Sequence, residues 1–436
     1  MSAATFDSWG RVRRADRNAQ TFSKTLANQL LKKQQGGLLP FGNGRSYGDS
    51  CHNDVGALID MREQSSIHAL DEYSGVLTAD AGVMLHEIIA HVLPKGWFLP
   101  VTPGTQLVTL GGAIANDVHG KNHHRRGTFG NHIEGFELLR SDKGTLWCSP
   151  EQNSDLFHAT IGGLGLTGII TRAQLKLMPV QTADIEQKTV RLNRLSDFFE
   201  HIEDADAENE YCVAWIDSLS RGSKMGRGHL LLGNHAKVGS RAPMSPKARL
   251  SVPFTPPFAM INSLSLKAFN FAYFNKLREA ERTDRVGYSS YFYPLDGVGN
   301  WNRLYGPHGL FQHQSVVPFE NGEAIVAKLI EASQKAGQGS FLTVLKRFGE
   351  VPSPGLLSFP KPGFTLTLDF ANSGPATLKL LDRLDELTLS AGGRVNPYKD
   401  ARMAASTFQT GFPNWRELEA LRDPAMMSDF WRRVTG

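Results

Sequence analysis

The sequence predicts a two-domain α+β protein, and three observations support this fold class. A chain of 436 residues exceeds the length that one hydrophobic core usually supports, so two domains are expected. Its 43 glycines exceed the average share of about 7% and gather in the first 170 residues, between short strand and helix patterns. Beyond residue 180 the pattern changes to apolar strands and amphipathic helices, which indicates an antiparallel sheet backed by helices.

The first unit, residues 6–180, is predicted from short elements that alternate. Apolar residues at helical spacing predict a helix over residues 21–34, which the glycine pair at 36–37 ends. Two more helices are expected, over residues 84–93 and 154–161. Strands are expected over residues 38–41, 57–61, 67–71, 76–81, 97–101 and 169–177, with a further strand pair that turns at residues 142–144.

The second unit, residues 181–393, carries longer elements, and residues 394–436 are expected to return to the first unit. Strands are predicted over residues 211–216, 314–317, 364–370 and 393–396, and helices over residues 322–336 and 376–390. The stretch 240–275 begins with proline, serine and basic residues and then becomes rich in Phe and Leu. It is either an ordinary loop with a core helix, or a mobile apolar segment that contacts a lipid surface or a lipidic substrate.

Composition excludes several classes of protein. Apolar residues make up 41% and charged residues 21%, which is typical of a globular protein and not of a disordered one. No stretch of about twenty apolar residues is present, and the N-terminus lacks the apolar core of a signal peptide. Three widely spaced cysteines (Cys51, Cys148 and Cys212) fit a reducing compartment. A net charge of +4 gives no reason to expect nucleic-acid binding.

Three short motifs match known patterns, but their context contradicts each of them. Residues 163–168 fit the Rossmann pattern G-x-G-x-x-G, yet they follow a predicted helix and precede a strand, which is the reverse of what that fingerprint requires. Residues 44–48 fit the serine-hydrolase pattern G-x-S-x-G, but a turn sequence follows where a helix is needed. His119, His123 and His124 have zinc-like spacing, but Gly120 replaces the glutamate of H-E-x-x-H, so no metal is expected.

The glycine-rich loops are better explained together, as one ligand-binding surface. They lie at residues 42–48, 103–105, 111–112 and 162–165 and are separated by strands. Glycines let successive backbone N–H groups converge on an anion without obstruction by side chains. A large dinucleotide that lies between these strands would account for all four loops, whereas turns of a β-rich fold are the alternative.

Longer stretches of the sequence resemble a known family. LLPFGNGRSYGDS, FLPVTPGTQLVTLGGAIANDVHGKNHHRRGTFGNHI and LFHATIGGLGLTGII resemble the FAD domain of the vanillyl-alcohol oxidase/p-cresol methylhydroxylase superfamily. Within it the chain is most similar to the decaprenylphosphoryl-β-D-ribose 2′-oxidase group, the flavin half of a ribose-to-arabinose epimerase. The likeness continues through YPLDGVGNWNRLYG, FQHQSVVP, TVLKRFG, GFTLTLDF, GGRVNPYKDAR and DPAMMSDF, so it covers nearly the whole chain.

The resemblance implies a two-domain FAD-linked oxidase fold, with an FAD domain of two α+β subdomains and a substrate domain. The residues that it places at FAD are Gly42, Asn43, Gly44, Arg45, Ser46, Tyr47, Gly48, Pro103, Gly104, Thr105, Gly111, Gly112, Ala115, His119, Gly120, Asn122, Gly165, Gly168, Ile169 and Lys399. Some relatives attach FAD through a histidine directly before the serine of the first loop. Because Arg45 stands there, the resemblance implies non-covalent FAD.

On the substrate side, the residues implied are Lys121, Trp215, Gln314, Lys346, Phe348 and Thr367, the last of which replaces a cysteine of the mycobacterial enzymes. The catalytic residues implied are Tyr47, His119, Lys346 and Lys399. Hydride transfer from a secondary alcohol to a flavin needs an acceptor for the hydroxyl proton and a cation near the negative charge that develops. Lys399 is the candidate cation, and either His119 or Lys346 accepts the proton or orients the hydroxyl.

The implied reaction is oxidation of the 2′-hydroxyl of a polyprenylphosphoryl ribofuranose to the keto sugar. The implied partners are the polyprenyl-phosphate-linked sugar, a quinone or other electron acceptor, and a separate NAD(P)H-dependent keto-sugar reductase. We expect a cytoplasmic protein, with peripheral contact at the inner membrane if the substrate is lipid-linked. Two alternatives stay open: an aldonolactone or alditol oxidase that acts on soluble sugars, and a non-catalytic flavin-binding protein.

Overall fold

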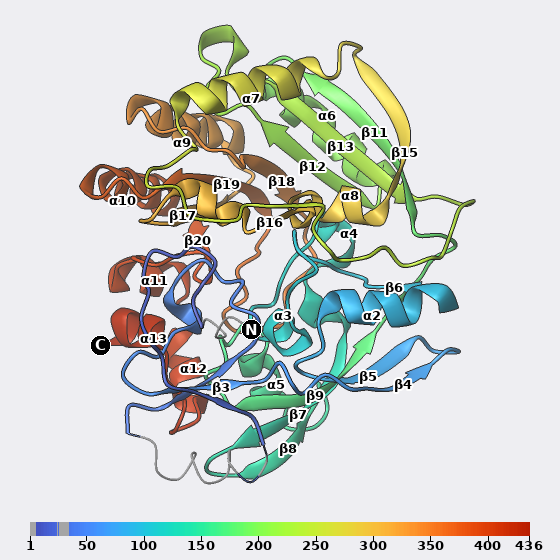
Figure 1. The fold of residues 1–436 in the computed structure, drawn as a ribbon, viewed down its shortest axis with the longest axis vertical. Coiled ribbons are helices and arrows are strands. Elements are labelled where there is room, and N and C mark those ends of the chain that lie inside the picture. The colour runs from blue at the N-terminus through green and yellow to red at the C-terminus, as the bar shows by residue number, and fades with distance from the viewer. Residues whose placement is uncertain (1–5, 24, 26–34) are drawn as a thin grey trace.

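Two groups of strands organise the chain, which the computed structural model describes over residues 6–23, 25 and 35–436 (Figure 1). The lower group in Figure 1 contains a three-stranded parallel sheet and a five-stranded antiparallel sheet, and the upper group is an eight-stranded antiparallel sheet. The mixed α+β architecture and the large antiparallel sheet are therefore confirmed. Among the described residues, no helix is both long and apolar enough to cross a membrane.

The lower sheets are made almost entirely by the first 180 residues. The parallel sheet has the order β1 (Ala19–Thr21), β3 (Ala57–Asp60), β2 (Leu38–Phe41). The antiparallel sheet has the order β4 (Ile67–Asp71), β5 (Val76–Asp80), β9 (Ile169–Lys176), β7 (Ile133–Arg140), β8 (Gly144–Cys148). The helices of this part are α2 (Leu85–Val92), α3 (Leu110–Ala115), α4 (His123–Arg126) and α5 (Ser154–Thr160), and β6 (Trp97–Phe98) pairs with β10 (Met178–Pro179).

The large sheet is covered on both faces. Its order is β15 (Glu281–Gly287), β11 (Asp184–Leu192), β13 (Gly228–His235), β12 (Tyr211–Ile216), β18 (Val344–Phe348), β19 (Gly363–Ala371), β17 (Leu310–Val317), β20 (Arg394–Val395). One face packs against α6 (Leu195–Glu208), α9 (Gly322–Lys335) and α10 (Pro375–Ser390), and this layer forms an apolar core of its own. Because side chains alternate along a strand, β12 directs Cys212 and Ala214 to that core and Trp215 to the opposite face.

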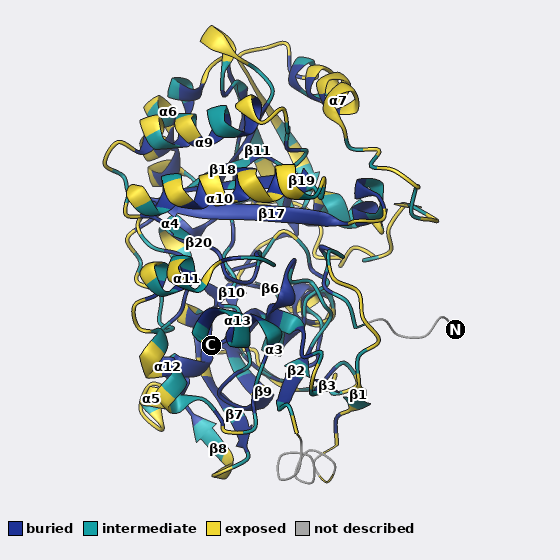
Figure 2. Cartoon of the chain, turned by 90° about the vertical axis from the view of Figure 1, so that its left-hand side faces the viewer, coloured by how far each residue is buried: buried dark blue, intermediate teal, exposed yellow. Residues whose placement is uncertain are grey.

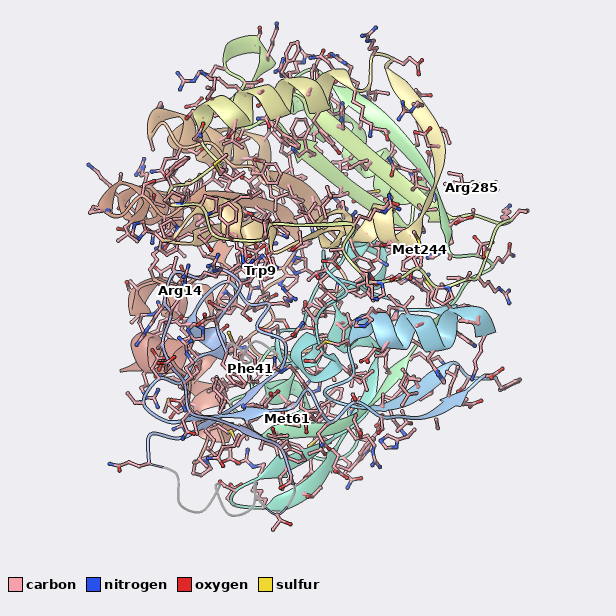
Figure 3. All side chains as sticks on the ribbon, viewed as in Figure 1. Trp9, Arg14, Phe41, Met61, Met244 and Arg285 are labelled. Atoms are coloured by element: carbon pink, nitrogen blue, oxygen red, sulfur yellow. The ribbon has the colours of Figure 1, made fainter. Side chains whose placement is uncertain are left out.

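Helix α7 (Ser263–Asn275) lies over the opposite face, where the Tyr273 ring packs edge-on against Trp215 with 4.6 Å between centroids. The chain before α7 runs along the same side of the molecule; its strand β14 (Leu250–Ser251) pairs with β16 (Val298–Gly299), and Met244 lies beside α8 (Tyr288–Phe292), as Figure 3 shows. The segment 240–275 is therefore a loop that β16 and α8 contact, followed by a helix. Its mobility remains a prediction.

The last forty residues run back to the lower sheets, as α11 (Ala405–Gly411), α12 (Trp415–Leu421) and α13 (Asp429–Thr435) in Figure 1. Leu38 of β2 forms a parallel bridge with Met426. The Arg433 guanidinium makes an ion pair of 2.7 Å with Asp49, which directly follows the first glycine loop. Residues far apart in the sequence thus share one core.

Several predicted elements differ from the observed ones. The predicted strand 97–101 is only Trp97–Phe98, because Pro100 cannot donate a ladder hydrogen bond and the partner β10 has two residues. The strand predicted over 314–317 begins four residues earlier, since buried Gln312 and His313 bond to Asp369 and Asp385. Strands β11, β13 and β15 and helix α6 were not predicted. Most of the helix predicted over 21–34 lies outside the described residues, and Thr21 ends β1.

Candidate active site

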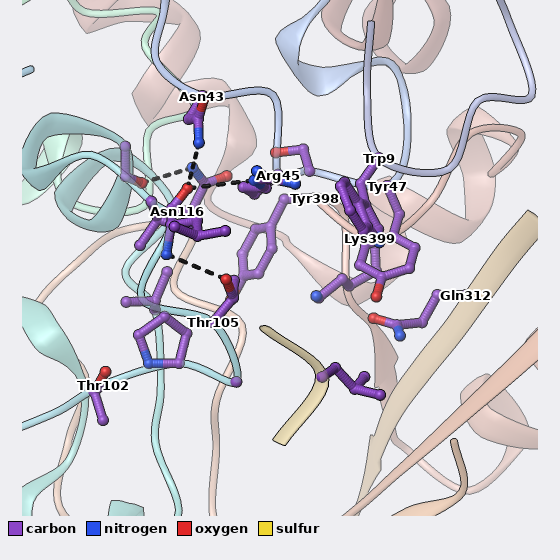
Figure 4. A pocket seen from close by; sticks show the side chains of 18 of the residues that line it. Trp9, Asn43, Arg45, Tyr47, Thr102, Thr105, Asn116, Gln312, Tyr398 and Lys399 are labelled. Atoms are coloured by element: carbon purple, nitrogen blue, oxygen red, sulfur yellow. Dashed lines mark hydrogen bonds between the residues drawn. The ribbon is translucent and has the colours of Figure 1, made fainter. Parts of the chain in front are cut away.

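A cavity of about 680 Å³ lies between the glycine-rich loops and the face of the large sheet that α7 covers. Its volume is in the range of cofactor and small-molecule sites. The lower wall comes from residues 40–51, 102–121 and 160–170, and the upper wall comes from β12, β17, β18 and β19. Tyr398 and Lys399, from the returning C-terminal segment, close it on one side (Figure 4).

Most of the residues predicted at FAD line this cavity. They are Gly42, Asn43, Gly44, Arg45, Ser46, Tyr47, Pro103, Gly104, Thr105, Gly111, Gly112, Ala115, His119, Gly120, Gly165, Gly168 and Lys399. Three others lie outside its lining. Gly48 packs against the Asp400 backbone, Asn122 donates to the Pro100 carbonyl and to Glu210, and Ile169 is fully buried in the core around β3.

The glycines of these loops differ in whether neighbouring protein atoms leave room for a side chain. A Cβ on Gly104 would meet no atom within 4 Å, so no neighbouring protein atom requires glycine at this position. A Cβ on Gly48 would lie 1.4 Å from the Asp400 carbonyl oxygen, and one on Gly42 would lie 2.4 Å from Thr109 Oγ1. Gly48 and Gly42 are therefore required by neighbouring protein atoms. Close approach to a ligand, the reason inferred from the sequence, stays a prediction for Gly104.

The lower wall and the C-terminal segment that closes the cavity offer polar atoms that make no hydrogen bond to a described protein atom. Within the described part of the chain, Ser50 Oγ, His119 Nδ1 and Tyr398 Oη are buried without a hydrogen-bond partner. Buried polar groups are nearly always hydrogen-bonded, so these atoms indicate a missing partner. The Arg45 guanidinium lies 4.4 Å from the centre of the Trp9 ring (Figure 4). Bare backbone, unsatisfied donors and a cation fit a dinucleotide with a diphosphate.

Three lysines face the cavity, and each contacts an aromatic ring. The Nζ atoms of Lys399, Lys121 and Lys346 lie 4.4, 4.4 and 5.7 Å from the ring centres of Tyr47, Tyr291 and Phe348. Lys346 Nζ also donates to the Gly120 carbonyl at 3.2 Å. These contacts fix where each ammonium lies relative to the cavity.

Burial lowers the pKa of all three lysines. It lowers the pKa of Lys399 from 10.5 to about 8, against the opposing effect of the Asp369 carboxylate. The pKa of Lys346 falls to about 7, through burial and then through the charge of Lys399, and that of Lys121 falls to about 7, through burial and then Lys346. Near neutral pH a part of this cluster is therefore uncharged and able to accept a proton.

Asp369 is the carboxylate whose charge acts on Lys399. It is fully buried, its Oδ1 accepts from Gln312 Nε2 at 2.6 Å, and its Oδ2 has no partner among the described residues. Burial raises the pKa of Asp369 to about 7, although Gln312 and Lys399 oppose the rise. Gln312 and Lys399 lie together at one end of the view in Figure 4.

His119 is held in one protonation state by a chain of hydrogen bonds. The Tyr398 backbone N–H donates to Asn396 Oδ1 at 3.2 Å, so the Asn396 amide nitrogen must point the other way and donates to Gln314 Oε1 at 2.9 Å. Gln314 Nε2 then donates to His119 Nε2 at 3.0 Å. Burial, followed by the charge of Lys346, holds the pKa of His119 well below its usual range. His119 is thus a neutral imidazole with its proton on Nδ1.

The predicted substrate residues surround this group. Lys121, Trp215, Gln314, Lys346 and Thr367 line the cavity, and Thr367 pairs in register with Gln314. Phe348 lies behind the lining, where it packs edge-on against the His119 ring with 4.9 Å between centroids. The three histidines of the zinc-like spacing do not converge: His123 packs on Phe348, whereas His124 Nε2 contacts the Asn209 carbonyl.

Several lining residues were missed by the sequence reasoning. They are Trp9, Asn116, Asp296, Trp301, Gln312 and Tyr398. Gln312 had a detectable signal, because it stands two residues before Gln314 and so shares its face of β17. Trp9 and Asp296 reach the cavity only through tertiary packing, for which the local sequence carries no signal.

Comparison with known proteins identifies the family. A model of an FAD-binding domain matches residues 27–149. A decaprenylphosphoryl-beta-D-ribose oxidase of Mycolicibacterium smegmatis is 36% identical over 415 residues, which cover 91% of this chain and 89% of that protein. The chain belongs to the FAD-binding oxidoreductases of the p-cresol methylhydroxylase (PCMH) type. An uncharacterised protein of Streptomyces coelicolor is 35% identical over 81% of this chain and 100% of its own length. Cytokinin dehydrogenase 9 of Oryza sativa is 34% identical over 32% of this chain and 27% of its own length.

For an FAD-linked oxidoreductase of this family, the glycines make a matched pair of variants. We expect Gly104→Ala to leave the melting temperature of the apoprotein unchanged, since its Cβ meets no protein atom, and to weaken FAD binding by about tenfold or more, since it enters the cavity. Gly48→Ala should lower the free energy of unfolding by about 1–3 kcal/mol or more, through overlap with Asp400. Thermal melts and fluorescence titration with FAD measure both, and equal effects of the two variants would refute the distinction.

The hydrogen-bond chain to His119 predicts a change of tautomer. In Asn396→Asp the carboxylate still accepts from Tyr398 N–H but no longer donates to Gln314, so the Gln314 amide should turn and offer Oε1 to His119. His119 should then carry its proton on Nε2. Two-bond ¹⁵N–¹H spectra of ring-labelled holoprotein report this, with His119→Gln for assignment. The control is Asn372→Asp, at a half-buried asparagine outside this hydrogen-bond chain. A wild-type His119 that already carries the Nε2 proton would contradict the scheme.

Proposed function

We propose that this protein oxidises the 2′-hydroxyl of a polyprenylphosphoryl ribofuranose to the 2′-keto sugar, as the first half of an epimerisation to the arabinose form. The observation that carries the proposal is the division of one cavity into a polar and an apolar part. Lys121, Lys346, Lys399, His119 and Gln314 form the polar part. Pro246, Ala248, Phe269, Tyr273, Phe341 and Leu342 form the apolar wall.

A lipid-linked sugar phosphate needs both parts. The phosphate and hydroxyl groups require cations and hydrogen-bond partners, whereas a polyprenyl chain gains free energy in proportion to the apolar surface that it buries. A soluble-sugar oxidase has no use for an apolar wall, which disfavours the lactone or alditol alternative. A non-catalytic flavin-binding protein has no use for three costly half-buried lysines beside the cofactor loops. The name of the Mycolicibacterium smegmatis relative supports the same substrate class.

The side chains divide the chemistry between them. The glycine-rich loops would hold FAD, which would supply the acceptor for the hydride of the carbinol carbon. Lys346 Nζ, whose pKa of about 7 leaves it partly uncharged, takes the proton of the substrate hydroxyl. The carbon–oxygen single bond of the substrate then becomes the carbonyl of the keto sugar. His119 donates from Nδ1 and orients a bound oxygen, because Gln314 occupies its Nε2. Lys399 supplies the cation that stabilises the negative charge developed by hydride transfer, and the ring of Tyr47 holds its ammonium in place.

Other parts of the reaction fall to partners. A quinone or other electron acceptor would reoxidise FAD, and a separate NAD(P)H-dependent reductase would convert the keto sugar to the arabinose form. The direct test of the proposal is anaerobic mixing of the holoprotein with polyprenylphosphoryl ribose, while the flavin absorbance is followed. Bleaching of the flavin supports the proposal, and an unchanged spectrum at saturating substrate refutes it.

FAD should be dissociable. Arg45 occupies the position from which relatives form a histidyl–flavin bond, and its guanidinium is turned onto Trp9. We expect acid or heat to release all of the yellow cofactor into the supernatant. Flavin fluorescence that stays with the denatured polypeptide on a gel would show the expectation to be wrong.

Lys399 should contribute to the reduction step and not to cofactor binding. Lys399→Ala should retain FAD but slow flavin reduction by roughly a hundredfold, the scale at which loss of one preorganised charge-stabilising donor acts. Lys399→Arg should rescue only in part, because a planar fork cannot replace a compact ammonium. The wild-type reduction rate should fall as pH rises through about 8, where Lys399 loses its proton, and this limb should be absent in Lys399→Ala. Stopped-flow reduction at several pH values tests both points; near-normal bleaching would remove Lys399 from the catalytic set.

A further inference from the structure

One stretch of chain carries most of the exposed large apolar side chains. Of the twelve such side chains in the described residues, eight lie between Met244 and Phe271. They are Met244, Leu250, Phe254, Phe258, Met260, Leu264, Phe269 and Phe271. Leu264 is 79% exposed and Phe254 is 68% exposed. Single apolar residues are often this exposed on soluble proteins, but a group of them along one stretch is unusual.

The backbone beneath these side chains is held, so they cannot turn inward together. Helix α7 buries Leu266, Asn270 and Phe274, and Asn270 donates to Asp217 Oδ1 at 2.6 Å. This anchor leaves the opposite side of α7 in solvent. The loop before α7 is fixed by the Arg303 guanidinium, which donates to the carbonyls of residues 252 and 253. Figures 1 and 2 place α7 and this loop on one side of the molecule, which is largely exposed in Figure 2.

The same region has a one-sided charge. Between Asp217 and Glu279 the sequence contains no Asp or Glu but ten Lys and Arg residues. Lys247, Arg249 and Lys267 are exposed and make no ion pair with any described residue. Apolar side chains that alternate with uncompensated cations are the combination that anionic lipid surfaces bind, since the cations meet headgroups and the apolar side chains enter the acyl boundary.

The stretch also reaches the cavity. Pro246, Ala248, Phe269 and Tyr273 line it, while their neighbours Leu250, Leu264 and Phe271 are in solvent. One continuous piece of chain therefore joins the apolar wall of the cavity to the exposed apolar surface. A lipid chain that leaves the cavity along this wall meets apolar side chains and not water.

We propose that residues 244–278 form a docking surface for an anionic lipid bilayer. Phe254, Phe258, Leu264 and Phe271 enter the boundary of the acyl chains, and Lys247, Arg249 and Lys267 contact the headgroups. The proposal rests on the proposed function, which gives the surface its role. The polyprenyl chain of the substrate stays in the bilayer while the sugar phosphate enters the cavity.

Co-sedimentation of the holoprotein with vesicles tests this surface. Vesicles of phosphatidylcholine with phosphatidylglycerol should bind the protein, less so at high salt, and vesicles of phosphatidylcholine alone should bind it weakly. Phe258→Ser with Leu264→Ser, and separately Lys247→Glu with Arg249→Glu, should each weaken binding to the anionic vesicles by about tenfold or more. Tyr73→Ser, which is 99% exposed outside the stretch, is the matched control and should bind like the wild type. Unchanged FAD content shows that each variant is folded.

Wild-type vesicle binding by both double variants would overturn the proposal. So would a dimer in sedimentation velocity without lipid that Phe258→Ser with Leu264→Ser abolishes, because it would assign the surface to a second copy of this chain. Flavin reduction by a short-chain, water-soluble polyprenylphosphoryl ribose separates the two proposals. Vesicle binding without reduction rejects the proposed substrate and keeps the surface, whereas reduction without vesicle binding rejects the surface and keeps the substrate.

Discussion

The contact between the first glycine loop and the returning C-terminal segment determines the geometry of the site. Tyr47 N–H donates to the Tyr398 carbonyl at 3.2 Å, and Gly48 packs so closely on Asp400 that any side chain would overlap its carbonyl. These contacts join residues more than three hundred positions apart, and they leave Lys399 as the side chain that projects beside the Tyr47 ring. The ion pairs of Arg433 with Asp49 and Asp400 tie α13 to both sides of this contact.

The same contact also brings charges together that would otherwise stay in water. Removal of Lys121, Lys346 and Lys399 from bulk solvent costs free energy, and the lowered pKa values of all three express that cost. Asp369 offsets a part of it for Lys399 alone. A fold gains nothing in stability from three mutually repelling ammonium groups, so their retention at one cavity is better explained by an anionic ligand that compensates them. A diphosphate cofactor and a phosphorylated sugar both provide such charge.

The sequence predicted those parts of the fold and site that depend on local pattern. Strand 211–216 and the helices near 322–336 and 376–390 were predicted because apolar periodicity is strong there, whereas β15, ERTDRVG, is a polar edge strand without such a signal. Motif resemblance placed Lys346 and Lys399 at the cavity, although a lone lysine is ordinarily a surface residue. It did not find Asn396 or Asp369, whose importance comes from contacts across the sheet. Nor did it distinguish Gly104, which has no protein atom near its Cβ position, from Gly48, which packs on Asp400.

Residues 240–275 present different faces. One behaves as the core helix of the first prediction, and another is an exposed apolar surface, for which lipid contact stays a prediction. Leu266 and Phe274 behave as an ordinary core helix, and Phe269 and Tyr273 line a cavity, while Leu264 and Phe271 are left in solvent. A core helix needs apolar residues only along the side that it buries, but α7 also carries apolar residues on its exposed side. Leu264 and Phe271 are exposed, and the sequence between Asp217 and Glu279 contains no Asp or Glu that would give the usual solubilising charge pattern. The surface thus has the composition that we propose for a lipid contact, and it is continuous along the chain with the apolar wall of the cavity.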